Sequence, residues 1–353
     1  MMMIEPAREQ LAALFTDQYE LTMLQSYFAE GMDGEAVFEL FFRELPKVRN
    51  FAVAAGLDPV LTFLEGFQFT DPEMDYVGSL DVFGDAFIDQ LRELRFTGDV
   101  NAPPEGTIVF PNEPLVQVIA PLPEAQVVET MVLNQMHYAT VAASKAVRSV
   151  LAADGRAVVD FAARRTPGVD GALALARAAC LAGFKATSNL LAGRLYDLPV
   201  TGTMAHSYLE AFGHDQSAFE AFARMYPCTT LLIDTFDVMA ATDLVIEMSE
   251  RLGEGFNVGA VRIDSGDLGE LARNVRRRLD DAGLNDVKVF ASGGLDEYRI
   301  AEHVADGDPI DGFGVGTKVG VSRDAPDLDC AYKLVAYRGR SEEHTSELQS
   351  LLI

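Results

Sequence analysis

Polar side chains follow two apolar segments in the second half of the chain. "LPVTGTMAH" ends at Thr203 and His206, and "GAVRIDSGD" carries Asp264, Ser265 and Asp267. An imidazole can act as a base, a nucleophile or a hydrogen-bonding group. Carboxylates can bind vicinal ribose hydroxyls and can share a Mg²⁺ ion with diphosphate oxygens. The alternatives are a histidine that only begins a helix and carboxylates that cap the next helix.

Two glycine-rich loops, "VFASGGLDE" and "GFGVGTKVG", come near the end of the same half. Glycine lets the backbone approach a ligand closely, and N–H groups at a helix start can bind phosphate oxygens. The alternative is a pair of tight turns between strands and helices. The predicted phosphate-binding residues are Ser292, Gly293, Gly294, Gly314, Gly316 and Thr317.

Adjacent arginines, Arg164 and Arg165, follow Asp160 in "DFAARRTPGVDG". The planar guanidinium group suits a carboxylate or a phosphate, although a surface salt bridge is the simpler alternative in so acidic a chain. The other histidines have no spacing with His206 that indicates a metal site, so metal ligands stay unassigned.

The elements that must position these groups follow a strand–helix alternation from residue 156 onward. Seven short apolar segments alternate with helical ones such as "GALALARAACLAG" and "DLGELARNVRRRLDDAG". This order predicts parallel strands wrapped by helices. No G-x-G-x-x-G follows the first strand, which favours a closed or nearly closed (β/α) barrel over a doubly wound sheet. All strand C-termini of such a barrel open onto one face, so we expect one site there.

The first part of the chain is mixed. "TDQYELTMLQSYFAEG" predicts a helix, "EAVFELFFRELP" a strand, and the segment from about Glu124 to Ala153 a long helix. The predicted fold class is therefore α/β, an irregular (β/α) barrel packed against an N-terminal α+β domain. The predicted divisions are 1–130 with a connecting helix to about 153, a barrel over 154–337, and a tail over 340–353.

Composition narrows the function. The 353 residues carry a formal net charge of −26 and a sequence pI near 4.4, which argues against nucleic-acid and anionic-membrane partners. No apolar run is long enough for a membrane helix, and the start has no secretory pattern. Cys180, Cys228 and Cys330 lack metal-ligand spacing and are expected to be buried and reduced, which predicts a cytoplasmic protein.

The chain resembles nicotinate phosphoribosyltransferases, of the type II phosphoribosyltransferase family, over residues 11 to 337. The resemblance is carried by these motifs: "LFTDQYELTM", "FELFFRELP", "FAVAAGLDPVLTFLEGFQF", "EGTIVFPNEP", "DFAARRTPGVDGAL", "ATSNLLAG", "GTMAHSYLEAF", "VRIDSGDL" and "GFGVGTKV". It implies an enzyme of NAD salvage that joins nicotinate to phosphoribosyl diphosphate, with ATP as a co-substrate and Mg²⁺ as a cofactor. It also implies a homodimer with shared active sites.

Residue roles are carried over by motif. The resemblance implies that His206 is the histidine that ATP phosphorylates and that Asp264 acts with it in catalysis. Tyr19, Arg164 and Arg165 would lie near nicotinate, with arginine meeting its carboxylate. Asp160 matches an acidic position near the base pocket of the related nicotinamide enzyme. Further substrate-binding residues are Arg262, Ser265 and Asp267, and the glycine-loop residues above would hold the 5′-phosphate.

Two alternatives stay open: a related nicotinamide or quinolinate phosphoribosyltransferase, and an inactive fragment that binds a sugar phosphate. The arginine pair favours an acidic substrate. The segment "RSEEHTSELQS" resembles the conceptual translation of a sequencing adapter. Residues 340–353 are therefore interpreted as a non-native tail, with an ordinary polar terminus as the alternative, and the natural protein is expected to be longer.

Overall fold

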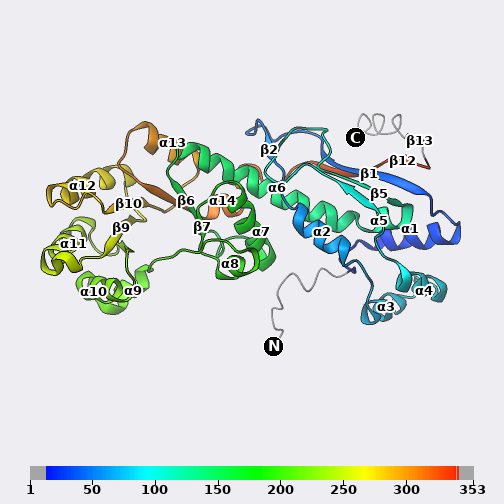
Figure 1. The fold of residues 1–353 in the computed structure, drawn as a ribbon, viewed down its shortest axis with the longest axis horizontal. Helices are drawn as coiled ribbons and strands as arrows, with labels where there is room; N and C mark the ends of the chain where they lie inside the picture. Colours follow the sequence, from blue (N-terminus) through cyan, green and yellow to red (C-terminus); the bar gives the residue numbers. More distant parts are fainter. Residues whose placement is uncertain (1–12, 339, 342–353) are drawn as a thin grey trace. The chain divides into compact units, whose positions relative to one another are not determined.

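The computed structural model of the chain describes residues 13–338 and 340–341, which divide into two compact units (Figure 1). The N-terminal unit comprises the chain up to Ser144 together with the part from Asp324 onward. The barrel unit comprises Lys145–Arg323.

These divisions lie elsewhere than the sequence places them. The first falls within helix α6 (Glu129–Ala152) and not after it. Strand β12 (Cys330–Tyr337), assigned above to the barrel, belongs to the N-terminal unit because it pairs along its length with β1 (Glu35–Phe42). Most of the predicted tail, 342–353, lies outside the described residues.

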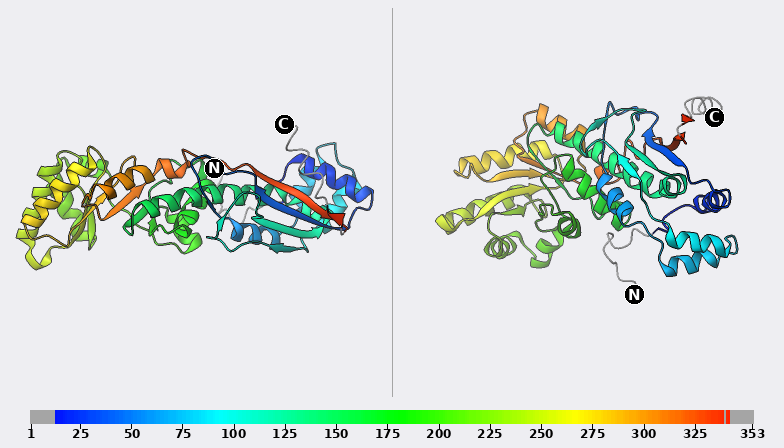
Figure 2. Two further views of the ribbon diagram at one scale, coloured as in Figure 1. Left: turned by 90° about the horizontal axis from the view of Figure 1, so that it is seen from above. Right: turned by 45° about the vertical axis from the view of Figure 1, so that its right-hand side comes forward.

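The N-terminal unit is built on an antiparallel sheet with the strand order β13–β12–β1–β5–β3. Figure 2 shows β1 and β12 running side by side. Alternate residues of β1 are buried, as the two-residue period of a strand requires. The remaining strands are β3 (Asp99–Asn101), β5 (Val116–Pro121) and β13 (Arg340–Ser341), with β2 (Ala52–Val53) and β4 (Ile108–Val109) in a separate pair.

Six helices accompany this sheet in the described part of the unit. Helix α3 begins with a capping box in which the Thr70 N–H donates to Glu73 Oε2 at 2.7 Å. The helix expected from Glu124 to Ala153 is interrupted at Val128, where α5 ends and α6 follows. The helices are α1 (Gln18–Ala29), α2 (Leu57–Glu65), α3 (Asp71–Gly78), α4 (Asp85–Glu93), α5 (Leu122–Val127) and α6.

The barrel unit contains a curled, wholly parallel sheet with the strand order β7–β6–β11–β10–β9–β8. This arrangement confirms the predicted fold class of an irregular α/β barrel. The strands are β6 (Ala157–Asp160), β7 (Ala186–Thr187), β8 (Thr229–Leu232), β9 (Val258–Ile263), β10 (Lys288–Ala291) and β11 (Gly312–Val315).

The seventh predicted strand, "LPVTGTMAH", forms only an isolated bridge between Val200 and Thr187. Pro199 has no N–H to donate to a ladder, which limits pairing there. The segment still links the two open edges of the sheet. Thr187 exchanges backbone hydrogen bonds of 3.0 Å with Pro199 and Thr201, and the Thr203 hydroxyl donates to the Thr230 carbonyl on β8. The six strands thus form a curled half-barrel, and this segment runs between its two edge strands, β7 and β8.

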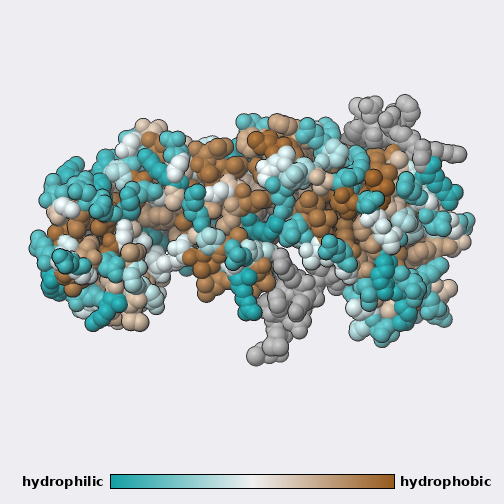
Figure 3. Space-filling model, viewed as in Figure 1, coloured by the Kyte–Doolittle hydropathy of each residue, from teal (hydrophilic) through white to brown (hydrophobic). Residues whose placement is uncertain are grey.

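Helices surround this sheet (Figure 1). Helix α12 is an example of how these helices pack. Its buried residues recur at helical spacing: Leu268, Ala272, Val275 and Leu279. Hydrophilic side chains cover its outer face (Figure 3). The helices are α7 (Gly168–Leu181), α8 (Leu190–Tyr196), α9 (His206–Phe212), α10 (Asp215–Met225), α11 (Val238–Leu252), α12 (Leu268–Asp281), α13 (Glu297–Ala305) and α14 (Thr317–Gly320), with a 3-10 turn at Gly253–Gly255.

Two expectations from composition can be compared with the structure. Across the described ranges, none of the helices is both long and apolar enough to cross a bilayer. The three cysteines are unpaired, but Cys228 is exposed and not buried as expected. It sits at φ +56° in the turn that enters β8, where its N–H bonds to Asn257.

Candidate active site

The parallel strands of the barrel unit end at one edge, and the loops that follow them form the candidate site. His206, Arg262, Asp264 and Ser292 come from three different strand–helix connections and from β9 itself. The structure brings these four side chains into one connected group. The strand-end pattern in the sequence therefore corresponds to a real cluster.

His206 is the first residue of α9, and its ring lies between two loops. Nδ1 is 3.1 Å from the Thr235 hydroxyl, and Nε2 is 3.9 Å from Asp264 Oδ2. The side chain is 42% exposed. A ring oriented by two polar neighbours and open to solvent suits a reacting group better than a core histidine.

The Asp264 carboxylate is held at the centre of the group. Its Oδ1 accepts the Ser292 hydroxyl and lies 3.5 Å from Arg262 Nη1. Its own N–H donates to Asp234 Oδ2 at 3.0 Å, and the Ser265 hydroxyl donates to the same oxygen at 2.5 Å. Asp234 therefore fixes the turn after β9, while its Oδ1 is buried with no hydrogen-bond partner among the described residues.

Arg262 is the cation beneath this cluster, with 12% of its side chain exposed. Nη2 donates to the Met204 carbonyl at 2.9 Å, and Nη1 lies 3.4 Å from the Ser292 hydroxyl. Burial lowers the pKa of the guanidinium, Asp264 and Asp234 oppose that shift, and Arg164 lowers the pKa further. The charge of Arg164 therefore acts on Arg262, although no hydrogen bond joins the two side chains among the described residues.

The first glycine loop begins at Ser292, whose N–H donates to the Ile263 carbonyl at 2.9 Å. Gly293 and Gly294 both adopt left-handed backbone, at φ +94° and +65°. A Cβ on Gly293 would lie 1.8 Å from the carbonyl oxygen of Asp264. Glycine is thus required here because two protein backbones meet, which places the loop directly against the Asp264 turn.

The second glycine loop contains residues of two kinds. Gly314 is buried in β11, where a Cβ would lie 2.6 Å from the Phe161 ring, so packing alone accounts for glycine. Gly316 and the exposed Thr317 lead into the four-residue α14 at the strand end. Gly316 and Thr317, unlike Gly314, lie where a ligand can reach them.

The three predicted site residues at the end of β6 have different environments, because Asp160 is buried and the two arginines are exposed. Asp160 is 1% exposed, and its carboxylate accepts the Ala162 N–H and the Thr187 hydroxyl, each at 2.7 Å. Burial raises the pKa of Asp160, and these two hydrogen bonds oppose the shift. Asp160 therefore holds the start of the loop after β6 through buried hydrogen bonds. Arg164 and Arg165 are exposed, and neither has an ion-pair partner in the described part of the chain.

Asp267 caps a helix, as the alternative interpretation expected. It is the N-cap of α12, and its Oδ1 accepts the Glu270 N–H at 2.9 Å. That hydrogen bond is the main cause that lowers the pKa of the exposed Asp267. The geometry gives Asp267 a structural function, and no contact joins it to the cluster of His206, Asp264 and Ser292 in the described residues.

Tyr19 belongs to the N-terminal unit and is 49% exposed on α1. Burial of its hydroxyl and a hydrogen bond with Glu20 raise the pKa of Tyr19. Glu20 is fully buried, and one amide nitrogen of Gln126 donates both to Glu20 at 2.8 Å and to Glu129 at 3.0 Å. Burial raises the pKa of Glu20 from 4.5 to about 7.

This carboxyl gives a pH-dependent prediction. The unfolded chain releases the Glu20 proton near pH 4.5 and the folded chain near pH 7, so the group's contribution to stability is lost as the pH rises through that interval. Glu20→Gln keeps this side chain neutral at every pH. The free energy of unfolding of the variant, measured relative to the wild type, should therefore be higher at pH 8 than at pH 5 by on the order of 1 kcal/mol. Thermal unfolding at both pH values tests this, with the exposed Glu30→Gln as control. Equal behaviour of the two variants would contradict it.

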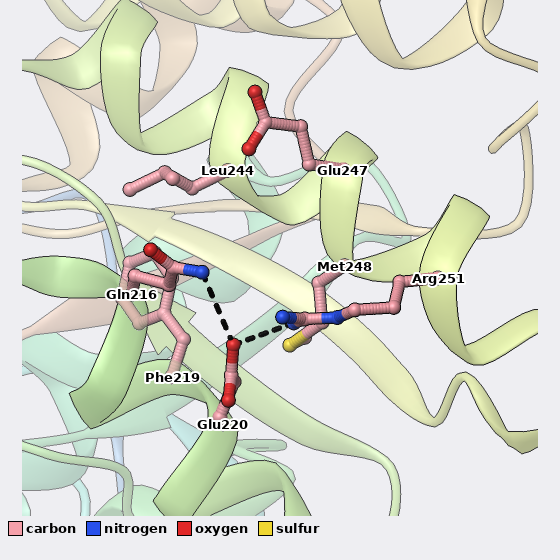
Figure 4. A pocket seen from close by; sticks show the side chains of 7 residues that line it. All are labelled: Gln216, Phe219, Glu220, Leu244, Glu247, Met248 and Arg251. Atoms are coloured by element: carbon pink, nitrogen blue, oxygen red, sulfur yellow. Dashed lines mark hydrogen bonds and ion pairs between the residues drawn. The ribbon is translucent and has the colours of Figure 1, made fainter.

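A cavity of about 120 Å³ lies between α10 and α11 (Figure 4). Arg251 Nη2 contacts Glu220 Oε1 at 2.5 Å across it, and Gln216 lies 3.4 Å from the same oxygen. Arg251 accordingly lowers the pKa of Glu220. The cavity separates two packed outer helices, and none of the candidate site residues lines it.

Thr235 is the functional candidate that the sequence reasoning missed. It directly follows Asp234 after β8, and its hydroxyl is the contact that orients the His206 ring. The signal was available, because Thr235 stands at a strand end like the residues that were selected. A threonine beside an aspartate is less conspicuous than a histidine or a glycine loop.

The chain is similar to known proteins over most of its length. Residues 14–137 match the family described as nicotinate phosphoribosyltransferase (NAPRTase) N-terminal domain. The chain is 58% identical over 332 residues to the nicotinate phosphoribosyltransferase pncB2 of Mycobacterium tuberculosis, covering 94% of this chain and 72% of that protein. It is 40% identical over 326 residues to the nicotinate phosphoribosyltransferase of Bacillus subtilis, covering 92% and 66%.

A solved structure shows a similar fold. The crystal structure of human nicotinic acid phosphoribosyltransferase superimposes with a TM-score of 0.82 at 30% sequence identity. The match covers 93% of this chain and 76% of the human chain. The likeness therefore extends over both units of the described structure.

Proposed function

The chain belongs to the nicotinate phosphoribosyltransferase family, and we propose that it joins nicotinate to phosphoribosyl diphosphate, giving nicotinate mononucleotide and diphosphate. The observation that carries the proposal is the cluster at the strand ends. His206, Arg262, Asp264 and Ser292 form one connected group at the edge where barrel enzymes bind their substrates.

The chemistry follows from the groups present. The bond from ribose C1 to diphosphate breaks as the pyridine nitrogen attacks C1, through a transition state with oxocarbenium character. Positioning and charge stabilisation are therefore the main tasks of the protein. Arg262 and Asp264 would contact the phosphoribosyl group, and Ser292 with the glycine loops would hold its 5′-phosphate. The exposed Arg164 and Arg165, which have no ion-pair partner among the described residues, would supply cations for the carboxylate of nicotinate.

The residues present fit a shared Mg²⁺ ion. No group of three or more potential ligands exists among the described residues, so the protein alone does not form a cage. Asp264 Oδ2 and the unpartnered Asp234 Oδ1 are oxygen donors of the kind that bind Mg²⁺ together with phosphate oxygens and water. When bound, the ion would neutralise charge on the leaving diphosphate.

We assign ATP coupling to His206. A ring nitrogen would attack the γ-phosphorus of ATP, forming the N–P bond as the bond to ADP breaks, and water would later release phosphate. Exposure of the ring and its orientation by Thr235 and Asp264 support this role. A phosphoryl group there would lie beside Asp264, which contacts Arg262, and would favour mononucleotide formation by changing how diphosphate is bound.

We further propose that the protein is cytoplasmic and acts as a homodimer. The family resemblance implies shared active sites, and a half-exposed Tyr19 on α1 is accessible to a ligand held by a second copy. Sedimentation of the purified chain with and without substrates would test the assembly.

Turnover assays with nicotinate, nicotinamide and quinolinate, each with and without ATP, test the function. Of the three bases, we expect only nicotinate to support diphosphate release. We expect ATP to stimulate this release in the wild type. His206→Ala should abolish ATP stimulation and ATP cleavage, while His214→Ala, an exposed N-cap of α10, should retain both. Full ATP stimulation in His206→Ala would contradict the assignment, and preference for another base would favour one of the related enzymes.

A further inference from the structure

Two consecutive acidic residues lie where the first glycine loop meets α13, and each is paired with a lysine from a different element. Asp296 Oδ2 accepts Lys318 Nζ at 2.6 Å, and Glu297 accepts Lys145 Nζ at 2.7 Å and 2.9 Å. Neither lysine is part of the connected group around Asp264. Both pairs lie at the end of the first glycine loop, whose beginning contacts the Asp264 turn.

The Lys318–Asp296 pair joins the two glycine loops. Asp296 follows Ser292, Gly293 and Gly294, and Lys318 follows Gly316 and Thr317. The side chains of Asp296 and Lys318 are 14% and 27% exposed, so solvent screens the contact less than a surface pair. Burial works against ionisation of Asp296, yet its pKa is lowered overall because Lys318 and the Arg299 N–H bond to it and Lys145 lies near.

The first loop needs such an anchor. Its two left-handed glycines restrict the backbone little, so the loop cannot define its own conformation. Ser292 and Gly293 hold its beginning against the Asp264 turn. Asp296 holds its end in two ways, by capping α13 through the Arg299 N–H at 3.0 Å and by pairing with Lys318.

We propose that Lys318 and Asp296 are positioning residues, whose ion pair fixes the spacing between the two glycine loops and so pre-organises the cradle for the 5′-phosphate. The inference rests on the proposed function, because it takes these loops to be the phosphate site. Pre-organisation increases affinity by removing the cost of ordering the loops when the ligand binds.

Substitution of the pair should therefore weaken phosphoribosyl binding selectively. Lys318→Met removes the cation, and Asp296→Asn removes the charge but keeps a good N-cap for α13. For each variant we expect KM for phosphoribosyl diphosphate to rise about tenfold, with little change in kcat or in KM for nicotinate. Lys318→Arg should recover most of the loss, and the double variant should lose no more than either single variant.

A second measurement does not depend on turnover. Ribose 5-phosphate, titrated calorimetrically into each variant, should bind about tenfold more weakly than to wild type, and the amides of 292–297 should exchange hydrogen faster. Lys288→Met is the matched control, because Lys288 pairs with Asp311 at 3.4 Å with 62% of its side chain exposed.

The outcomes separate the two proposals. Suppose that Lys318→Met turns over nicotinate like the wild type, with unchanged KM for phosphoribosyl diphosphate and unchanged affinity for ribose 5-phosphate. The positioning role alone is then overturned. It is also overturned if Lys318→Met loses no more affinity than Lys288→Met. If the wild type shows no nicotinate turnover but both variants bind ribose 5-phosphate more weakly than the wild type, the proposed reaction is overturned and the positioning role is supported.

Discussion

Gly293→Ala is expected to lower kcat/KM by about 100-fold or more. The new Cβ would lie 1.8 Å from the carbonyl oxygen of Asp264, so loop and turn must separate by more than 1 Å. That movement would pull Ser292 away from the Asp264 carboxylate, which its hydroxyl now contacts. Because the reaction depends on positioning, a displacement of this size should be costly. Steady-state kinetics with both substrates measures it.

Gly294→Ala is the matched control, one residue further along. Its φ of +65° imposes left-handed strain on alanine, but the added Cβ meets nothing within 4 Å. We expect destabilisation of about 1 kcal/mol and a much smaller loss of activity than in Gly293→Ala. If the two variants lose activity equally, backbone strain and not the contact with Asp264 is responsible.

The sequence was sufficient to predict the edge at which the site lies. Parallel strands place their C-termini together, so selecting polar residues at strand ends selected neighbours, and His206, Asp264 and Ser292 do meet. Arg262, which lies within β9 and was assigned only from the family resemblance, contacts Asp264 and Ser292. The assignment of β12 shows the limit of the same reasoning. An apolar strand pattern does not specify its partner, and this strand returns to β1, almost 300 residues earlier, as the register of the pair shows.

Individual roles were harder to predict, because one residue type serves several purposes. Asp267 follows a strand as Asp264 does, but its carboxylate caps α12. Gly314 lies in a glycine-rich loop motif, but the Phe161 ring explains it. The Lys318–Asp296 pair joins residues from separate loops, so only the folded backbone reveals it. Local pattern locates groups along the chain, and tertiary packing decides what each one contacts.

The largest effect on stability is expected at the buried pair of Lys145 on α6 and Glu297 on α13. Lys145 Nζ contacts both oxygens of Glu297, and the side chains are 2% and 8% exposed. Both residues belong to the barrel unit, and Glu297 directly follows the end of the first glycine loop. Forming such a pair stabilises a protein little, because desolvation offsets the attraction. Removing one partner leaves the other charge buried and is far more costly.

Lys145→Met should therefore reduce the free energy of unfolding of the barrel unit by about 3–5 kcal/mol. The double variant Lys145→Met/Glu297→Gln removes the buried charge and should recover at least half of that loss. Arg251→Met, which breaks an exposed pair with Glu220, is the control and should cost less than about 1 kcal/mol. Urea denaturation of the four proteins measures these differences. If the double variant is no more stable than Lys145→Met, the cost comes from lost lysine packing and not from the buried carboxylate that has lost its lysine, because only a charge effect can be relieved by the second substitution.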